Sequence, residues 1–375
     1  MRPRVWILAP RIGLNALGRP LLLADLLRDF AEPRLVGRAD QNGKIWAPAG
    51  DYPIEILPHS LAGSARALKK LVSGDRLVVS KALPQSLGLT LLANIRTSAF
   101  VLDLDDLEVA FAKPPPWPQK FRRKQVVMTA KAWRNVTLTH ALDIVAARVP
   151  KKTVVNRFLQ RRYGGELLPH VRDPAQVNPS HLSALKSAIG LPGERAWAGF
   201  VGSVKSHKGL SMLVDALAQL SGPGAPGLII LGIDERDPYC QEVIAKAMGL
   251  LGSSRFRWTG TFPLSAAPLY FSIPDILVIP SLPGPRSRGQ LPMKLFDGMA
   301  ASRAIVTTDA TEAGDILGSA GKVVSPDPSS ISRAIDELAQ NGTLREQLGR
   351  AAHQVLCDRY TRRHGAVLLR RLLCL

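Results

Sequence analysis

The segment 275–309 constrains the fold most, because a strand, a loop, a helix start and a second strand follow one another in it. DILVIP is an apolar run, and SLPGPR is a loop rich in Pro and Gly. Pro292 and the apolar spacing from Met293 to Ala300 predict a helix that starts near residue 292. AIVTT then predicts a short buried strand. This order is typical of an open α/β sheet, whose ligands bind at the carboxyl edge of the strands.

One basic and one acidic side chain lie at the start of the predicted helix. Lys294 and Asp297 are three residues apart, so they share one face near the helix N-terminus. The partial positive charge of a helix N-terminus, with a lysine beside it, favours a phosphate group. The sequence therefore predicts an anion site here.

Length and composition indicate two α/β domains without a membrane span. A chain of 375 residues is too long for a single core. We expect domains over 1–172 and 186–357, joined by a polar, proline-containing linker over 173–185. The three cysteines are scattered without metal-ligand spacing, which indicates a reducing compartment. No apolar run reaches the roughly 18 residues that a membrane span needs, and the first one is too short for a signal peptide.

The positive charge is concentrated in the first half of the chain. The formal net charge is +19, and residues 1–172 hold 28 Lys and Arg against 13 Asp and Glu. Residues 173–375 hold 21 against 17. This asymmetry indicates an anionic partner for the first half: lipid headgroups, nucleic acid or a polyanionic substrate.

Two features of the first half are candidates for chemistry. VWILAP predicts the first strand, and Gly18 follows it where a glycine lets the backbone approach a ligand, although a plain turn explains it equally well. There is no GxGxxG fingerprint. A second strand ends in the acids Asp103, Asp105, Asp106 and Glu108, which are compatible with a metal site or a general base. They are equally compatible with helix capping or with neutralising nearby arginines.

No acidic residue occurs from Val109 to Leu142, where basic and aromatic residues alternate. The basic residues include Lys120, Arg122, Arg123 and Lys124, and they are interleaved with Trp117, Phe121 and Trp133. This composition is typical of an interfacial membrane patch, which is the interpretation we favour. A solvated basic face and a nucleic-acid surface are the alternatives, and no nucleic-acid motif accompanies the charge.

A second strand-to-helix loop carries basic residues over 202–209. The strand WAGFV ends at Gly202, and Lys205, His207 and Lys208 precede an amphipathic helix. Because this loop and the start of the 292 helix both follow strands, they meet at one sheet edge and together predict a pyrophosphate cradle. Thr261, in a turn after a further strand, is placed to present its backbone to a nucleobase.

The order of these segments resembles the donor half of glycosyltransferase family 4, which has the GT-B fold of two Rossmann-like α/β domains. FVGSVKSHKG resembles that family's Gly-Arg-Leu-x-x-x-Lys-Gly loop: Gly202, Lys208 and Gly209 match, and Ser203 stands at the arginine. The resemblance implies that Lys208 binds the donor diphosphate and that Lys205 takes over from the arginine.

The 292 helix resembles a variant of the family motif that reads Pro-x-Lys-Leu-Phe-Glu-x-Met-Ala. Lys294 and Leu295 match it, and Asp297 replaces the second of the two family glutamates, which binds the ribose. Gly289 replaces the first, with Gln290 beside it. The candidate donor-binding residues are Gly18, Gly202, Ser203, Lys205, His207, Lys208, Thr261, Gln290, Lys294, Leu295 and Asp297.

The first half resembles the family more loosely. The strand end LDLDD aligns with a His-Asp pair, so that Asp105 replaces the histidine and Asp106 matches the acid. In this fold the tail 358–375 is a helix that packs back on the first domain. The candidate catalytic residues are Asp105, Asp106, Lys208 and Lys294.

The resemblance implies sugar transfer from a UDP- or GDP-linked donor, with retention of configuration and without a metal ion or cofactor. Lysines and a helix N-terminus would stabilise the leaving diphosphate. The basic half implies a lipid-linked, polysaccharide or lipopolysaccharide acceptor and a peripheral position on the cytoplasmic face of the membrane. The alternatives are an inactive GT-B scaffold that binds nucleotide, and a basic nucleic-acid-binding protein.

Overall fold

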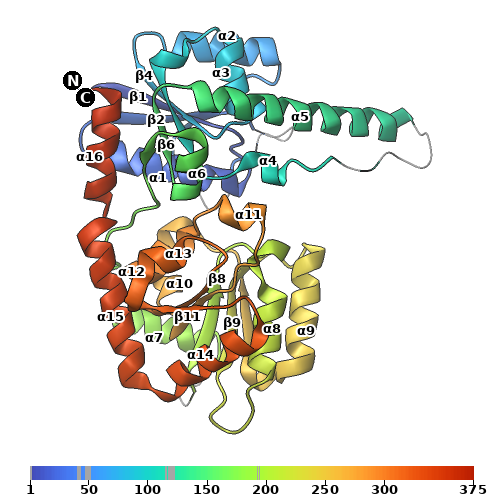
Figure 1. Ribbon diagram of the computed structural model, residues 1–375, viewed down its shortest axis with the longest axis vertical. Helices are drawn as coiled ribbons and strands as arrows, with labels where there is room; N and C mark the ends of the chain where they lie inside the picture. The colour runs from blue at the N-terminus through green and yellow to red at the C-terminus, as the bar shows by residue number, and fades with distance from the viewer. Residues whose placement is uncertain are drawn as a thin grey trace. The chain divides into compact units, whose positions relative to one another are not determined.

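The chain divides into two compact units, which are described separately below. The computed structural model describes residues 2–39, 44–46, 52–114, 116, 123–191, 193 and 195–375. The first unit comprises Met1–Pro169 and Arg362–Leu375, and the second comprises His170–Thr361. Both are α/β units built on a parallel sheet (Figure 1).

The sheet of the first unit has, in its described part, the strand order β3-β2-β1-β4-β5-β6-β7, and every neighbouring pair is parallel. The strands are β1 (Arg4–Ala9), β2 (Glu32–Gly37), β3 (Ile54–Ile56), β4 (Arg76–Ser80), β5 (Phe100–Leu104), β6 (Lys152–Val154) and β7 (Glu166–Leu167). The helices are α1 (Gly18–Leu27), α2 (Leu61–Leu71), α3 (Leu89–Leu92), α4 (Glu108–Phe111), α5 (Arg123–Arg148), α6 (Arg157–Tyr163) and α16 (Arg362–Leu373).

Helices lie on both faces of this sheet (Figure 1), and strand β5 is buried along its whole length. The one charged side chain within β5, Asp103, is fully buried. Arg19 of α1 donates to both of its carboxylate oxygens, at 2.8 and 3.0 Å, and also to the carbonyl of Leu168. Thr153 of β6 donates to the same carboxylate. A buried charge is tolerated only when it is paired and hydrogen-bonded in this way.

The sheet of the second unit has the order β10-β9-β8-β11-β12-β13, again with parallel neighbours. The strands are β8 (Trp197–Val201), β9 (Gly227–Ile233), β10 (Phe256–Gly260), β11 (Ile276–Ile279), β12 (Ala304–Thr308) and β13 (Lys322–Val324). The helices are α7 (Pro179–Ala188), α8 (Leu210–Ala218), α9 (Pro238–Arg255), α10 (Ala267–Phe271), α11 (Pro285–Arg288), α12 (Met293–Ala300), α13 (Ala313–Leu317), α14 (Pro328–Gln340) and α15 (Gly342–Arg359).

The prediction for segment 275–309 is confirmed in its order. β11 precedes α12, which begins one residue after Pro292, and β12 follows. The sequence did not indicate α11, because its four residues are too few to show an apolar period.

The expected linker over 173–185 is wrong in its second part. Asn178 accepts a hydrogen bond from the backbone N–H of Ser180, and Pro179 occupies the first helical position, so the polar residues cap α7 instead. The expected tail helix is also shorter than 358–375. α15 ends at Arg359, and α16 packs on α1 of the first unit.

Most of the long helix α5 lies in the acid-free segment, and this helix extends beyond the strands of its unit in Figure 1. Trp117, Lys120, Phe121 and Arg122 lie outside the described residues, and the side chains of Arg123 and Lys124 are not described either. Within the described chain, no helix has the length and hydrophobicity needed to span a membrane.

Candidate functional site

The loop after β8 is shaped by two glycines in the left-handed region. Gly202 has φ +103°, and a Cβ there would meet nothing within 4 Å, so space beside its backbone is open. Gly209 has φ +72°, and a Cβ would lie 1.8 Å from the carbonyl oxygen of Pro280, so only glycine fits. Between them, Lys208 donates from Nζ to the carbonyl and the hydroxyl of Ser203, each at 2.8 Å. Ser203, at the position of the family's arginine, therefore orients the lysine.

Lys294 carries a buried ammonium group at the start of α12. Its Nζ lies 3.1 Å from the centre of the Phe200 ring of β8. Among the described residues no hydrogen-bond acceptor contacts this buried nitrogen. Burial lowers the pKa of Lys294 well below its usual value, and the nearby charge of Lys208 lowers it further. An anion at this nitrogen would supply the hydrogen bonds and the charge that the aromatic ring does not.

His207 connects the two loops. Its carbonyl accepts a hydrogen bond of 3.0 Å from the backbone N–H of Leu282, which follows β11. Burial, followed by the charges of Lys208 and Arg286, lowers the pKa of its imidazole to about 4. A side-chain hydrogen bond with Gln290 opposes this shift. His207 is therefore neutral at pH 7, beside a cluster of cations that we call the donor cradle: Lys208, Arg286 and Lys294.

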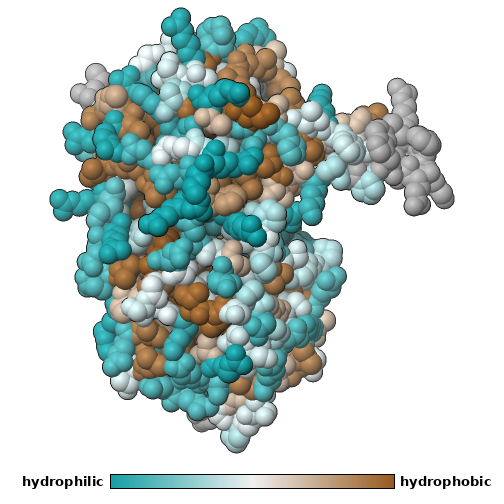
Figure 2. Space-filling view, in the orientation of Figure 1, coloured by the Kyte–Doolittle hydropathy of each residue, from teal (hydrophilic) through white to brown (hydrophobic). Residues whose placement is uncertain are grey.

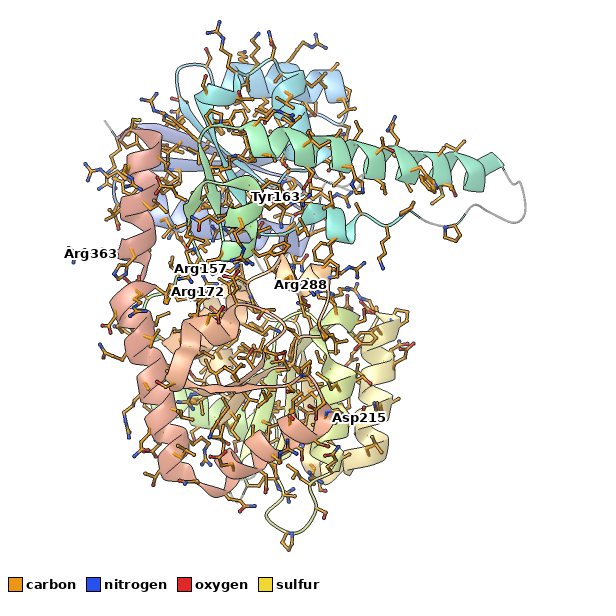
Figure 3. The ribbon with its side chains drawn as sticks, viewed as in Figure 1. Arg157, Tyr163, Arg172, Asp215, Arg288 and Arg363 are labelled. Atoms are coloured by element: carbon orange, nitrogen blue, oxygen red, sulfur yellow. The ribbon has the colours of Figure 1, made fainter. Side chains whose placement is uncertain are left out.

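Asp297 is held by an arginine from another part of the unit. Arg172, labelled in Figure 3, donates from Nε to its carboxylate, and the Asp297 side chain is only 12% exposed. The sequence predicted Asp297 as a ribose ligand without a partner of its own. Nothing in the spacing of Arg172, 125 residues before Asp297, indicated this contact.

The other predicted donor-binding residues differ in their burial and in their interaction partners. Gln290 is half-buried beside His207, Gly289 is buried, and Leu295 is a fully buried core residue. Lys205 points instead to Asp237, at 2.7 Å, and is half exposed. Thr261 is exposed after β10.

In the first unit, the predicted acid cluster surrounds a lysine. The Nζ of Lys81 lies 2.8 Å from a carboxylate oxygen of Asp105 and 3.0 Å from one of Glu108, and it also contacts Asp106. These three acids have the spacing of a metal site, but the Lys81 ammonium occupies the centre that a cation would need. The neutralising interpretation therefore fits the geometry, with Lys81 in place of an arginine.

The three carboxylates carry more negative charge than the single ammonium of Lys81 can neutralise, and the cluster is largely buried. Burial first, and then the charges of Asp106 and Asp105, raise the pKa of Glu108 to about 7, against the lowering effect of Lys81. Asp105 and Asp106, the predicted catalytic acids, are thus ion-paired, and Glu108 is the member that exchanges a proton near neutral pH.

A cavity of about 750 Å³ opens at the carboxyl ends of β1, β2 and β3 in the first unit. Its lining residues are Pro10, Arg11, Gly13, Leu14, Arg38, Ala39, His59, Gln85 and Lys131. The loop glycine that lines it is Gly13, whereas Gly18, which the sequence predicted for this role, is the first residue of α1 with ordinary helical angles. The sequence missed the cavity because its residues come from five separate segments.

A comparison with protein-family models matches residues 195–341 to "Glycosyl transferases group 1". The matched residues all lie within the second unit. A comparison with curated proteins finds no match.

Solved structures share the fold over the whole chain. A glycosyltransferase from Rickettsia africae has a TM-score of 0.72 and 14% identity, with 99% of each chain covered. Anabaena HepE in complex with UDP-glucose has a TM-score of 0.73 and 17% identity, also with 99% of each chain covered. WaaG, a glycosyltransferase involved in lipopolysaccharide biosynthesis, has a TM-score of 0.62 and 14% identity over 98% of this chain and 99% of its own. The fold is thus GT-B, as predicted, and with the family match it identifies the chain as a glycosyltransferase.

The raised pKa of Glu108 predicts that part of the stability is lost as pH rises. The ordinary pKa is 4.5 and the folded value is about 7, so the folded state binds more protons between these values. Glu108 therefore lowers the melting temperature as pH rises through this window, whereas His207, whose pKa is lowered from 6.5 to about 4, raises it over the lower part of the same range. We expect the melting temperature of the unmodified protein to fall relative to that of Glu108→Gln as pH rises. Thermal unfolding from pH 5 to 8 measures this.

Glu346→Gln is the matched control, because Glu346 is 73% exposed on α15. It should leave the pH profile unchanged. A difference in melting temperature between the unmodified protein and Glu108→Gln that stays constant with pH would contradict the assignment of this proton to Glu108.

Proposed function

We propose that the protein transfers a sugar from a UDP- or GDP-linked donor to a lipid-linked, polysaccharide or lipopolysaccharide-type acceptor. The reaction retains the anomeric configuration and needs no metal ion. The observation that carries the proposal is the buried, unpartnered ammonium of Lys294 beside Lys208 within the described part of the second unit.

The chemistry requires positive charge where the donor's leaving group develops negative charge. The bond between the sugar and the diphosphate breaks, and the diphosphate gains a negative charge that fixed cations stabilise. The two lysines and the N-terminus of α12 supply this charge. The neutral imidazole of His207 adds a polar group to the donor cradle without a further positive charge.

The matched structures support this assignment. HepE has been solved in complex with UDP, with UDP and glucose, and with UDP-glucose. The involvement of WaaG in lipopolysaccharide biosynthesis supports an envelope acceptor.

Lys294→Met is expected to weaken the binding of UDP and GDP by about tenfold or more. The substitution keeps the apolar stem under Phe200 but removes the charged hydrogen-bond donor. Isothermal titration calorimetry measures this affinity. Lys322→Met is the matched control, because Lys322 pairs with Glu337 on an exposed part of the same unit. Equal affinities in the two variants would refute the role of Lys294.

Transfer should continue in the presence of EDTA, because the lysines replace a metal ion at the diphosphate. The sugar in the product should have the anomeric configuration of the donor, which NMR of the product determines. Loss of activity with EDTA that Mg²⁺ or Mn²⁺ restores would contradict metal independence, and an inverted product would contradict retention.

The alternative of an inactive nucleotide-binding scaffold is supported by Gly289. This buried residue offers no carboxylate where the resemblance expects an acid that contacts the sugar. A donor-hydrolysis assay separates the alternatives, since a scaffold binds UDP or GDP without turning over any nucleotide sugar.

We also propose that helix α5 docks the protein on the cytoplasmic face of the membrane. Its described part exposes large apolar side chains, namely Val127, Met128, Trp133, Leu138 and Ile144. Lys131 and Arg134 are exposed among them. Hydrophobic and hydrophilic side chains alternate on the visible surface of the first unit (Figure 2). Apolar residues with interspersed basic ones suit an anionic lipid surface.

Met128→Glu combined with Trp133→Glu is expected to reduce binding to anionic vesicles several-fold, because it removes apolar contacts and adds repulsive charge. Vesicle co-sedimentation at two salt concentrations measures this. Leu92→Glu is a control, since Leu92 is exposed on α3 outside the patch. If single- or double-stranded nucleic acid competes with the vesicles at equal charge, the nucleic-acid alternative is favoured.

A further inference from the structure

The cavity of the first unit is lined by several basic side chains, and the proposed donor chemistry gives them no role. Four of its lining side chains are basic, namely Arg11, Arg38, His59 and Lys131, and none of the described residues that line it is acidic. These four come from the segments after β1, β2 and β3 and from α5. Because separate segments bring the same kind of side chain to one place, the cavity itself is electropositive.

Arg38 lies in the cavity wall, where one of its nitrogens is hydrogen-bonded within the described chain and its Nε is not. One terminal nitrogen donates to the carbonyl of His59, which holds the guanidinium in place. Its Nε is buried and has no hydrogen-bond partner among the described residues. A buried donor without an acceptor costs free energy, so an oxyanion at this nitrogen would be bound favourably.

The volume and the apolar part of the wall suit an organic ligand. About 750 Å³ lies within the range of roughly 300 to 1,000 Å³ that is usual for small-molecule sites. Pro10, Leu14 and Ala39 supply apolar wall, and Gln85 supplies a neutral hydrogen-bonding group. A ligand with an anionic group and an uncharged, partly apolar body matches this lining.

We propose that this cavity binds a phosphate group of the acceptor, with Arg38 as its principal contact. The inference rests on the proposed function and adds a substrate class to it: the acceptor is phosphorylated. Two sources share this chemistry, a soluble sugar phosphate and the headgroup of a phospholipid. Arg11 and Lys131, which are more exposed, add long-range attraction for either one.

The experiment is a calorimetric titration of the full chain with glucose 6-phosphate and with glucose. Saturating UDP or GDP is added first, so that phosphate does not occupy the donor cradle. We expect glucose 6-phosphate to bind about tenfold more tightly than glucose or better, and Arg38→Gln to abolish most of this difference. Arg96→Gln removes the same charge at an exposed site outside the cavity and should have no effect. If Arg38→Gln does not fold, Arg11→Gln with Lys131→Gln replaces it.

A parallel arm uses phosphatidylcholine vesicles with and without phosphatidylglycerol. Binding to phosphatidylglycerol that depends on Arg38, without binding of glucose 6-phosphate, assigns the phosphate to a lipid headgroup. The reverse result assigns it to a soluble sugar phosphate. Equal losses in Arg38→Gln and Arg96→Gln, or no dependence on Arg38 in either arm, would overturn the proposal. Failure of the proposed function would appear separately, as absent binding of UDP and GDP.

Discussion

Burial of a parallel sheet on both faces is the constraint on which the rest of each unit depends. Strands covered by helices leave little room for polar side chains except where the strands end. The exception, Asp103 within β5, needs Arg19, Thr153 and their hydrogen bonds to remain buried. The functional groups therefore gather at the carboxyl ends of the strands: the donor cradle in the second unit, and the cavity with Arg38 in the first.

Both candidate sites hold a basic side chain before any ligand is present. Lys294 places its ammonium against Phe200, and Arg38 leaves its Nε without an acceptor among the described residues. Burying such groups is unfavourable for the empty protein, and an anion relieves the cost. A site organised in this way stabilises developing charge without rearranging at the moment of reaction, which is the physical basis of electrostatic catalysis.

The sequence was most informative where residues close together in the chain determine the local structure. The strand-loop-helix order around Gly202 and Pro292 predicted an open α/β sheet with Lys208 and Lys294 at one edge, and the resemblance to a known family added the GT-B fold. It was less informative where a partner comes from a distant segment. Arg172 binds Asp297 across 125 residues, and Lys81 fills the acid cluster from 25 residues away. Neither contact can be recognised from spacing or periodicity. The sequence therefore suggested a ribose ligand for Asp297 and a metal site for the acid cluster without indicating the basic residues that pair with them.

By itself the sequence determined the alternation of strands and helices, the glycines of the donor loop and the excess of positive charge in the first half. These follow from local propensity and composition, which the chain carries at every position. Only the tertiary structure decided which charges are paired and which face open space. Lys205 is engaged by Asp237, whereas Lys294 has a buried nitrogen over an aromatic ring. Pairing depends on distances between segments remote in sequence, and folding alone sets those distances.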